Sequence, residues 1–338
     1  MSPSTVSWVV TDCLRFSAVV PLFTLLGIAG AVTLPGQDEL DSWSGGVIQQ
    51  AAERIGPAVV QIETVGGTAA HPLIPPGRPS TGTIVDREGH IVTAAVNLLH
   101  EPEAIMVRLA DGQRLNARIV GRNHSRQVVL LKIDAAPDVK FGETAAVVGQ
   151  TAIAVGKSRD PVHPELSSGI VSATGRVRGR AVQTDAAVSP LNYGGPLVDL
   201  EGRVLGILVP LVAAGEDPVS RVGWYDSGIG FAVPVADLRI PDMVAGGELH
   251  SGWSGISFRE SAGLASPAVV AAIEGDSPAG QAGIEPGDRV TAANGQPVEL
   301  LAGLRQISGP LYAGDILSLT LDRKGQVIER QLKLREHR

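Results

Sequence analysis

A glycine-rich turn between two apolar segments is the stretch of this chain most able to present a reactive side chain. Residues 183–198 read Q-T-D-A-A-V-S-P-L-N-Y-G-G-P-L-V, with Tyr193 directly before the glycine pair. Glycines permit the tight backbone turn that holds a side chain out into a cleft. The phenol of Tyr193 has an ordinary pKa of about 10, so it becomes a nucleophile only beside an activating base. The chemistry of the turn therefore depends on what the rest of the chain brings to it.

The elements that position this turn are expected to be short strands. Apolar and polar residues alternate over residues 58–65, and further strand-like runs follow with turn residues between them. These runs cover residues 82–85, 90–93, 105–109, 114–120, 128–133, 152–155, 169–173, 182–184, 196–199, 204–209 and 230–233. Asp111-Gly112 and Glu201-Gly202 are typical of hairpins. Many short strands without alternating helices favour antiparallel barrels, and a short helix is expected at Val47–Arg54.

Seven sequence blocks in this region resemble the HtrA (DegP/DegS) family of serine proteases. They are G-H-I-V-T at 89–93, G-R at 121–122, L-K-I-D at 131–134, S-G-I-V-S-A at 168–173, Q-T-D-A-A at 183–187, G-G-P-L-V at 194–198 and G-I-G-F-A-V-P at 228–234. The resemblance implies a mostly β, trypsin-like domain over residues 45–240, built as a double six-stranded β-barrel. In that fold the two barrels are perpendicular and the catalytic residues lie in the cleft between them.

The same resemblance identifies the positions of the catalytic triad, and all three are substituted. HtrA proteases carry the histidine in T-N-x-H-V, where this chain has Val96, and the aspartate at the start of D-L-A-V-L-K, where it has Gln127. Trypsin-like turns read G-N-S-G-G-P-L, which puts Tyr193 in place of the serine. A serine protease needs a histidine base and a carboxylate that orients it. We therefore expect no catalytic residue in this chain.

Neighbouring side chains could replace the missing groups only from displaced positions. His100 lies four residues past the histidine position, and we interpret it as a solvent-facing side chain. The former oxyanion turn comprises Leu191, Asn192, Tyr193 and Gly194, with leucine where proteases have glycine. A γ-branched residue resists the conformation that turns this N–H group inward. Two interpretations of Tyr193 stand side by side: the ring fills an abandoned pocket, or it plugs the cleft.

Residues 250–338 resemble a PDZ domain of the HtrA type. The blocks that carry the resemblance are S-P-A at 277–279, A-G-I at 282–284, P-G-D at 286–288 and N-G at 294–295. Such a domain binds a terminal carboxylate with backbone N–H groups and pairs the peptide with an adjacent strand. The predicted peptide-binding residues are Trp253, Ser254, Gly255, Ile256, Ser257 and Phe258. Ser254 replaces the usual aliphatic residue, and a domain that packs only on its own barrel is the alternative.

The N-terminus contains an uncharged apolar run, Ser17–Leu34, which is near the lower length limit for a helix that spans a bilayer. Arg15 precedes this run and acidic residues follow it, so the positive-inside rule leaves the N-terminus in the cytoplasm. We predict a transmembrane helix within residues 1–36. The alternative is a cleaved signal peptide with small residues at 29–31. Either segment would export the remainder of the chain.

Composition narrows the remaining classes of function. The net charge of −7 and the isoelectric point near 5.5 argue against a nucleic-acid-binding surface along the chain. A single cysteine, Cys13, excludes an internal disulfide framework. No Cys/His cluster has the sequence spacing of a zinc site, so we expect neither a structural metal nor a cofactor.

Together these features predict a catalytically inactive, DegS-like pseudoprotease with a PDZ domain. It would be a single-pass inner-membrane protein with its globular domains in the periplasm, or a secreted one if the leader is cleaved. The expected partners are protein C-termini and unfolded envelope proteins, and the expected role is that of a sensor, adaptor or regulator in protein quality control. The family implies a homotrimer or an assembly with an active paralogue. An active serine endopeptidase that uses displaced residues is the alternative.

Overall fold

The computed structural model describes residues 37–67, 77–135, 138–139, 141–160, 163–211, 228–259 and 266–337. The apolar run Ser17–Leu34, which we predicted to be a membrane anchor, lies outside these ranges. Among the helices that the structure describes, none is both long and apolar enough to span a membrane.

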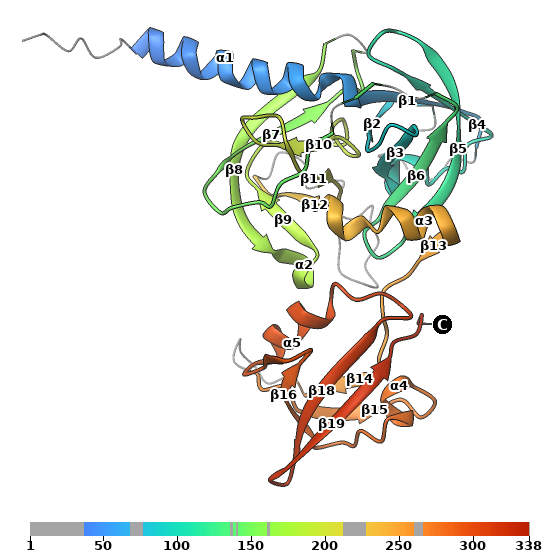
Figure 1. The fold of residues 1–338 in the computed structure, drawn as a ribbon, viewed down its shortest axis with the longest axis vertical. Coiled ribbons are helices and arrows are strands. Elements are labelled where there is room, and N and C mark those ends of the chain that lie inside the picture. The colour runs from blue at the N-terminus through green and yellow to red at the C-terminus, as the bar shows by residue number, and fades with distance from the viewer. Residues whose placement is uncertain are drawn as a thin grey trace, which may run out of the picture. The chain divides into compact units, whose positions relative to one another are not determined.

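Six strands in the first part of the chain close into an antiparallel barrel (Figure 1). They are β1 (Val59–Val65), β2 (Ser80–Ile84), β3 (His90–Ala94), β4 (Ala104–Arg108), β5 (Arg114–Asn123) and β6 (Val128–Ile133). Their order is β5-β4-β1-β2-β3-β6, and the pairing of β5 with β6 closes the barrel. β2 and β3 are buried along their whole length, because apolar and threonine side chains cover both of their faces.

A second closed barrel follows, in the order β10-β11-β12-β9-β8-β7. Its strands are β7 (Thr151–Gly156), β8 (Glu165–Gly175), β9 (Ala181–Thr184), β10 (Pro196–Val198), β11 (Val204–Leu208) and β12 (Gly230–Val233). The glycine-rich turn leads directly into β10, so the barrel wall holds both ends of that turn. The predicted mostly β, double-barrel architecture is confirmed.

The predicted helix at Val47–Arg54 is part of a longer helix. Helix α1 covers Gln37–Ile55. It passes through Gly45-Gly46, which lie just before the predicted start at Val47. Ala51 and Ile55 are fully buried in the core that the two barrels share. Burial of this face fixes the C-terminal half of the helix, which is the half that the apolar periodicity predicts.

A connector links the second barrel to the last domain. It contains the 3-10 helix η4 (Val235–Leu238), helix α3 (Ile240–Gly246) and the two-residue strand β13 (Glu248–Leu249). β13 runs parallel to β5 and extends the sheet of the first barrel. Gly121 of β5 permits the close approach of α3, because a Cβ atom there would lie 2.7 Å from the backbone oxygen of Met243 in α3.

The last domain has its own apolar core and two small sheets. Its elements are β14 (Ile256–Phe258), β15 (Val270–Ile273), α4 (Pro278–Gln281), β16 (Arg289–Ala293), β17 (Gln296–Pro297), α5 (Leu301–Ser308), β18 (Ile316–Arg323) and β19 (Gln326–Lys333). β14 pairs with β15, and β17-β16-β18-β19 form the second sheet. Ser277 caps α4 by accepting a hydrogen bond from the N–H of Gly280 at 3.1 Å, as its place before Pro278 predicts.

Candidate functional site

The three triad positions lie around the 3-10 helix η2 (Ala95–Leu98). The first residue of η2 donates its N–H to the backbone oxygen of Gln127 at 2.8 Å. Asn97 donates from Nδ2 to the backbone oxygen of Tyr193, also at 2.8 Å. Val96 stands between these two contacts and is buried. The fold thus brings together the positions that the sequence resemblance identified.

None of the side chains at these positions can act as a base at neutral pH. Val96 carries no polar atom, and the amide of Gln127 does not take up a proton. The side-chain oxygen of Gln127 is buried without a hydrogen-bond partner among the described residues. Burial raises the pKa of Tyr193 to about 12, so its phenol stays protonated and is a poor nucleophile. These three positions therefore offer no side chain that accepts a proton at neutral pH.

His100 does not supply the missing base. Its ring is buried, with Nε2 3.0 Å from Oγ1 of Thr64 in β1. Burial also lowers the pKa of His100. Our expectation of a solvent-facing side chain was wrong, because the chain after η2 turns the ring against β1. A histidine held by this hydrogen bond is not presented to the glycine-rich turn.

The former oxyanion turn is closed by its own hydrogen bonds. The N–H of Leu191 donates to Oγ of Ser189 at 3.3 Å, and its carbonyl oxygen accepts from Oγ1 of Thr81 at 2.7 Å. Asn192 uses Oδ1 to accept from the backbone N–H of Ser189 at 2.8 Å. An oxyanion hole needs N–H groups aimed at the reacting oxygen. In this turn the N–H of Leu191 already has an internal partner.

Tyr193 lines a cavity too small for a substrate side chain. The cavity has a volume of about 10 Å³ and lies among Val188, Tyr193, Val209 and Phe231. A single water molecule needs roughly 10–15 Å³ measured in this way. Tyr193 itself is 5% exposed. This cavity therefore has room for about one water molecule.

A much larger groove lies in the last domain. Its volume is about 430 Å³, within the range of about 300–1,000 Å³ that is typical of ligand sites. Ile256 and Phe258 of β14 line one side, Leu304 of α5 lines the other, and Leu317 and Leu319 also line it. Among the described residues β14 pairs only with β15, so its second edge is available to an added peptide strand.

Two arginines from the second barrel also line this groove. Arg178 belongs to the turn α2 (Arg176–Gly179) between β8 and β9, and Arg180 follows it. The carbonyl oxygen of Arg178 lies against Gly309 at the end of α5, where a Cβ atom would be only 2.0 Å away. The barrel thus contributes positive charge to the groove. Sequence reasoning missed both residues, although R-V-R-G-R at 176–180 is a visible basic cluster.

The predicted carboxylate-binding loop lies partly on the groove. Ser254, Ile256, Ser257 and Phe258 line it, whereas Trp253 lines a separate hollow and packs edge-on against His337. The backbone N–H of Ile256 donates to Oγ of Ser254 at 3.3 Å. The substituted serine therefore uses one of the amides that a bound carboxylate would need. These assignments as peptide-binding residues remain predictions.

Comparisons with known proteins agree with both domains. Residues 80–207 match the trypsin-like peptidase domain, and residues 253–334 match the PDZ domain. The chain is 34% identical over 266 residues to a probable DegP-like periplasmic serine endoprotease of Pseudomonas fluorescens, and 33% identical over 266 residues to one of Pseudomonas putida. The first alignment covers 73% of this chain and 54% of the relative, and the second covers 73% and 53%. This is an HtrA-type chain.

Solved structures of HtrA-type proteases share this fold. The serine endoprotease from Yersinia pestis aligns with a TM-score of 0.62 at 27% identity, covering 86% of this chain and 98% of that one. The HtrA-type protease AlgW with tripeptide aligns with a TM-score of 0.67 at 25% identity, covering 85% and 96%. The chain spans about half the length of the curated relatives that it matches.

In this HtrA-type chain a buried tyrosine joins the PDZ domain to the first barrel and the connector. Tyr312 is 2% exposed, and its hydroxyl accepts a hydrogen bond from Nδ2 of Asn123 at 2.8 Å. The same hydroxyl donates to the backbone oxygen of Asp237 at 2.7 Å. The guanidinium groups of Arg126 and Arg239 lie over its ring, 4.8 and 4.4 Å from the centroid. Both contacts are cation–π interactions.

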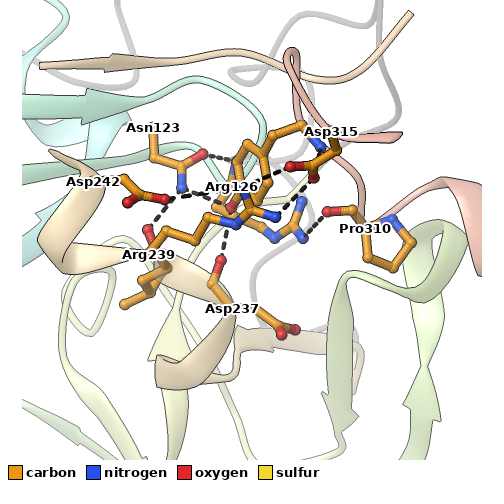
Figure 2. A network of polar contacts seen from close by, with 9 residues as sticks. Asn123, Arg126, Asp237, Arg239, Asp242, Pro310 and Asp315 are labelled. Atoms are coloured by element: carbon orange, nitrogen blue, oxygen red, sulfur yellow. Dashed lines mark hydrogen bonds and ion pairs between the residues drawn. The ribbon is translucent and has the colours of Figure 1, made fainter. Parts of the chain in front are cut away.

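Ion pairing completes this junction (Figure 2). Arg239 donates to both carboxylate oxygens of Asp315, at 3.0 and 2.7 Å, and Arg126 donates to the backbone oxygen of Pro310 at 2.9 Å. Arg126 is almost fully buried, and burial lowers its pKa. No sequence motif marks this cluster, because its members come from three separate segments. A buried arginine needs such partners to offset desolvation.

Proposed function

We propose that this HtrA-type chain is a catalytically inactive protein that binds free C-termini or unfolded peptide segments in its PDZ groove. The contrast between the two sites carries the proposal. The cavity at the former nucleophile position measures about 10 Å³, whereas the PDZ groove measures about 430 Å³. The PDZ groove therefore has room for a peptide segment, whereas the cavity beside Tyr193 has no room for a side chain.

The argument for inactivity rests on several losses that act together. Removal of one triad residue typically lowers kcat by about 10⁴–10⁶. Here Val96, Gln127 and Tyr193 replace all three, and the N–H of Leu191 is bonded within the turn. The similarity to relatives named as endoproteases supports a protease fold for this chain, but it does not supply the catalytic side chains. An endopeptidase with displaced residues would need a base at Tyr193, and the nearest candidate that we considered, His100, is bonded to Thr64.

The argument for peptide binding rests on the groove's chemistry. The open edge of β14 offers backbone hydrogen bonds, and the apolar lining offers contacts for a terminal side chain. Arg178 and Arg180 place positive charge where a peptide carboxylate would be attracted. The structure of the HtrA-type protease AlgW with tripeptide supports the binding of a peptide by analogy. The proposed ligand is therefore an extended peptide with a free carboxylate.

The proposed location rests on the names of the curated relatives and on the apolar run near the N-terminus. The curated relatives are named as periplasmic, and we propose that the globular domains of this chain also lie in the periplasm. The apolar run Ser17–Leu34 would tether them to the inner membrane as a single-pass anchor. In that place the ligands would be unfolded envelope proteins. A homotrimer, or an assembly with an active paralogue, is the proposed quaternary state.

A peptide-binding experiment tests this proposal. The full-length chain in mild detergent is titrated into fluorescent peptides from a C-terminal library, and binding is followed by fluorescence polarisation. Saturable binding of a subset of peptides is expected. Amidation of the peptide terminus should weaken it roughly tenfold or more, because a charge-assisted hydrogen bond is lost.

A matched pair of substitutions locates the binding site. Ile256→Asp introduces a charge at the apolar side of the groove and should abolish binding, whereas Val327→Asp, at a 77% exposed position on β19, should leave it unchanged. Circular dichroism checks that both variants fold. If no peptide binds, or if Ile256→Asp binds as the unaltered chain does, the groove is not the peptide site.

A second assay separates this proposal from the displaced-residue alternative. The full-length chain is incubated with a fluorophosphonate probe and with unfolded casein. We expect no labelled serine and intact casein after prolonged incubation. Labelling together with casein fragments would establish an active endopeptidase and would refute the inactive cleft, while leaving the peptide-binding result to be judged on its own.

A further inference from the structure

Three potential metal ligands meet where the first barrel joins the connector. His124 follows directly after β5, Glu248 belongs to β13, and His250 follows β13. One ligand atom from each side chain lies within 4.8 Å of the other two. Glu248 and His250 alternate by two residues, so they share one face of an extended chain. The parallel pairing of β13 with β5, and the 2.8 Å bond from the N–H of His124 to the oxygen of Leu249, bring the third ligand beside them.

The three side chains lie beside one another. The imidazole rings of His124 and His250 stack almost parallel, with centroids 4.4 Å apart and an interplanar angle of 13°. Nε2 of His124 is in close contact with a carboxylate oxygen of Glu248. Because the two ring planes are almost parallel and the lone pairs of the ring nitrogens lie in those planes, one ring must rotate for both nitrogens to bind the same ion. The set then offers two nitrogens and one carboxylate oxygen. This is a donor set that can hold a metal ion.

A second carboxylate orients one of the two rings. Nδ1 of His250 lies 3.1 Å from Oε1 of Glu336, in the chain that follows β19. A hydrogen bond from Nδ1–H to this carboxylate leaves Nε2 as the unprotonated nitrogen. Histidine ligands of zinc ordinarily donate their other ring N–H group to a carboxylate or a carbonyl in this way, which fixes the tautomer. Glu336 is thus an independent sign that His250 is prepared as a ligand.

We propose that His124, Glu248 and His250 bind a zinc ion, with Glu336 orienting His250. Two imidazole nitrogens and one carboxylate suit zinc rather than magnesium or calcium, which prefer oxygen ligands alone. Ligand atoms in a tetrahedral zinc site are about 3.4 Å apart, given bonds of about 2.0–2.2 Å. On binding, Nε2 of His124 and the carboxylate oxygen of Glu248 move apart to this spacing and the ligand atom of His250 approaches them. Side chains that are about half exposed, such as His124 and Glu248, can make this adjustment.

The proposed ion links parts of the chain that are distant in sequence. Its ligands come from the first barrel and the connector, and the orienting carboxylate comes from the C-terminal end of the PDZ domain. Zinc would therefore hold the connector strand β13 against β5 and stabilise the junction. The expectation from the sequence was that no structural metal is present. Sequence spacing missed this set because His124 and Glu248 lie 124 residues apart.

A calorimetric titration tests the site. The full-length chain in detergent, without a polyhistidine tag, is titrated with Zn²⁺ in a buffer that does not bind metals. We expect saturation at one equivalent, reversal by EDTA and a higher melting temperature with zinc, because the ion binds the folded state. Co²⁺ in place of Zn²⁺ should give the visible absorption of a four-coordinate site.

Substitutions distinguish this site from adventitious binding. The double variant His124→Gln/His250→Gln should lose the saturating equivalent and the thermal shift, and Glu336→Gln should weaken binding about 10–100-fold. His163→Gln is the matched control, because His163 is an exposed histidine paired with Asp160 at 2.8 Å, and this variant should bind zinc normally. A cooperative thermal unfolding transition measured in EDTA verifies that each variant is folded without metal. Absence of a saturating equivalent, or wild-type binding by the double variant, overturns the proposal.

Discussion

At the scale of single residues, Gly194 in the glycine-rich turn is held by close contacts with the first barrel. Gly194 has a left-handed backbone with φ of 91°, and a Cβ atom there would lie 2.2 Å from the backbone oxygen of Thr81. Thr83 donates from Oγ1 to the oxygen of Gly194 at 2.9 Å, so the first barrel holds this turn from β2. Packing between the barrels therefore requires the glycine even without catalysis.

Substitution of this glycine should destabilise the fold. Gly194→Ala adds backbone strain of about 1–2 kcal/mol and steric overlap that costs about 1–3 kcal/mol. Gly175→Ala is the matched control, since Gly175 also has positive φ, at 65°, but has open space around its Cβ position. Urea unfolding should show the larger loss for Gly194→Ala. Equal losses in the two variants would mean that overlap with Thr81 plays no part.

Tyr193 should make the fold sensitive to alkaline pH. Burial raises its pKa to about 12 from an unfolded value of 10.0, so the unfolded chain ionises first as the pH rises. The contribution to stability is complete below pH 10 and is lost as the pH rises through about 12. The difference amounts to roughly 2–3 kcal/mol. Comparison of unfolding free energies across this pH window should show a decline that is steeper by this amount in the unaltered chain than in Tyr193→Phe.

Restoring the serine should not restore catalysis. In Tyr193→Ser the new hydroxyl would face Val96 and Gln127 in place of a base and its orienting carboxylate, and the Leu191 N–H would remain bonded to Ser189. We expect no hydrolysis of casein above that of the unaltered chain. Measurable hydrolysis by this single variant would reveal a displaced base.

At the scale of elements, the junction around Tyr312 holds the PDZ domain on the barrel and the connector. Its hydroxyl bridges Asn123 at the end of β5 and the carbonyl of Asp237 in η4. This junction and the contact of α2 with α5 together place Arg178 and Arg180 beside the PDZ groove. The turn α2 adopts left-handed backbone angles at Val177 and Arg178, and it lies against the end of α5.

Removal of the bridging hydroxyl should weaken this junction. Tyr312→Phe leaves the side chain of Asn123 and the carbonyl of Asp237 each with one partner fewer, at a cost of about 1–3 kcal/mol. Tyr193→Phe is the matched buried substitution. Because burial alone raises the pKa of Tyr193, loss of its hydroxyl should cost less at neutral pH. Urea unfolding compares the two, and an equal or smaller loss in Tyr312→Phe would contradict the bridging role.

The elements were predictable from the sequence where local periodicity determines them. β6 occurs at the predicted residues 128–133 because an uninterrupted apolar run admits few alternatives. The triad positions are assigned from short motifs such as T-A-A-V and N-Y-G-G, and these assignments remain predictions. The buried state of His100, the arginines of the PDZ groove and the role of Tyr312 could not be predicted, since each depends on contacts between distant segments.

At the scale of the whole molecule, we propose that the barrels and the PDZ domain have different roles. In the barrels Tyr193 is buried beside a small cavity, and the PDZ domain offers an open strand edge near the barrel's arginines. The junction at Tyr312 and the proposed zinc site both connect the PDZ domain to β5 and the connector. A peptide bound in the groove would therefore contact a domain that is fixed to the scaffold.

The most direct test of this account follows one peptide through binding and release. A peptide with a free C-terminus, selected from the library, is incubated with the full-length chain and captured together with it. The bound peptide is then eluted, and its mass is measured by mass spectrometry. We predict retention by the unaltered chain at the intact mass and no retention by Ile256→Asp. Recovery of shortened fragments, or the absence of any retained peptide, would contradict a peptide-binding protein with an inactive protease fold.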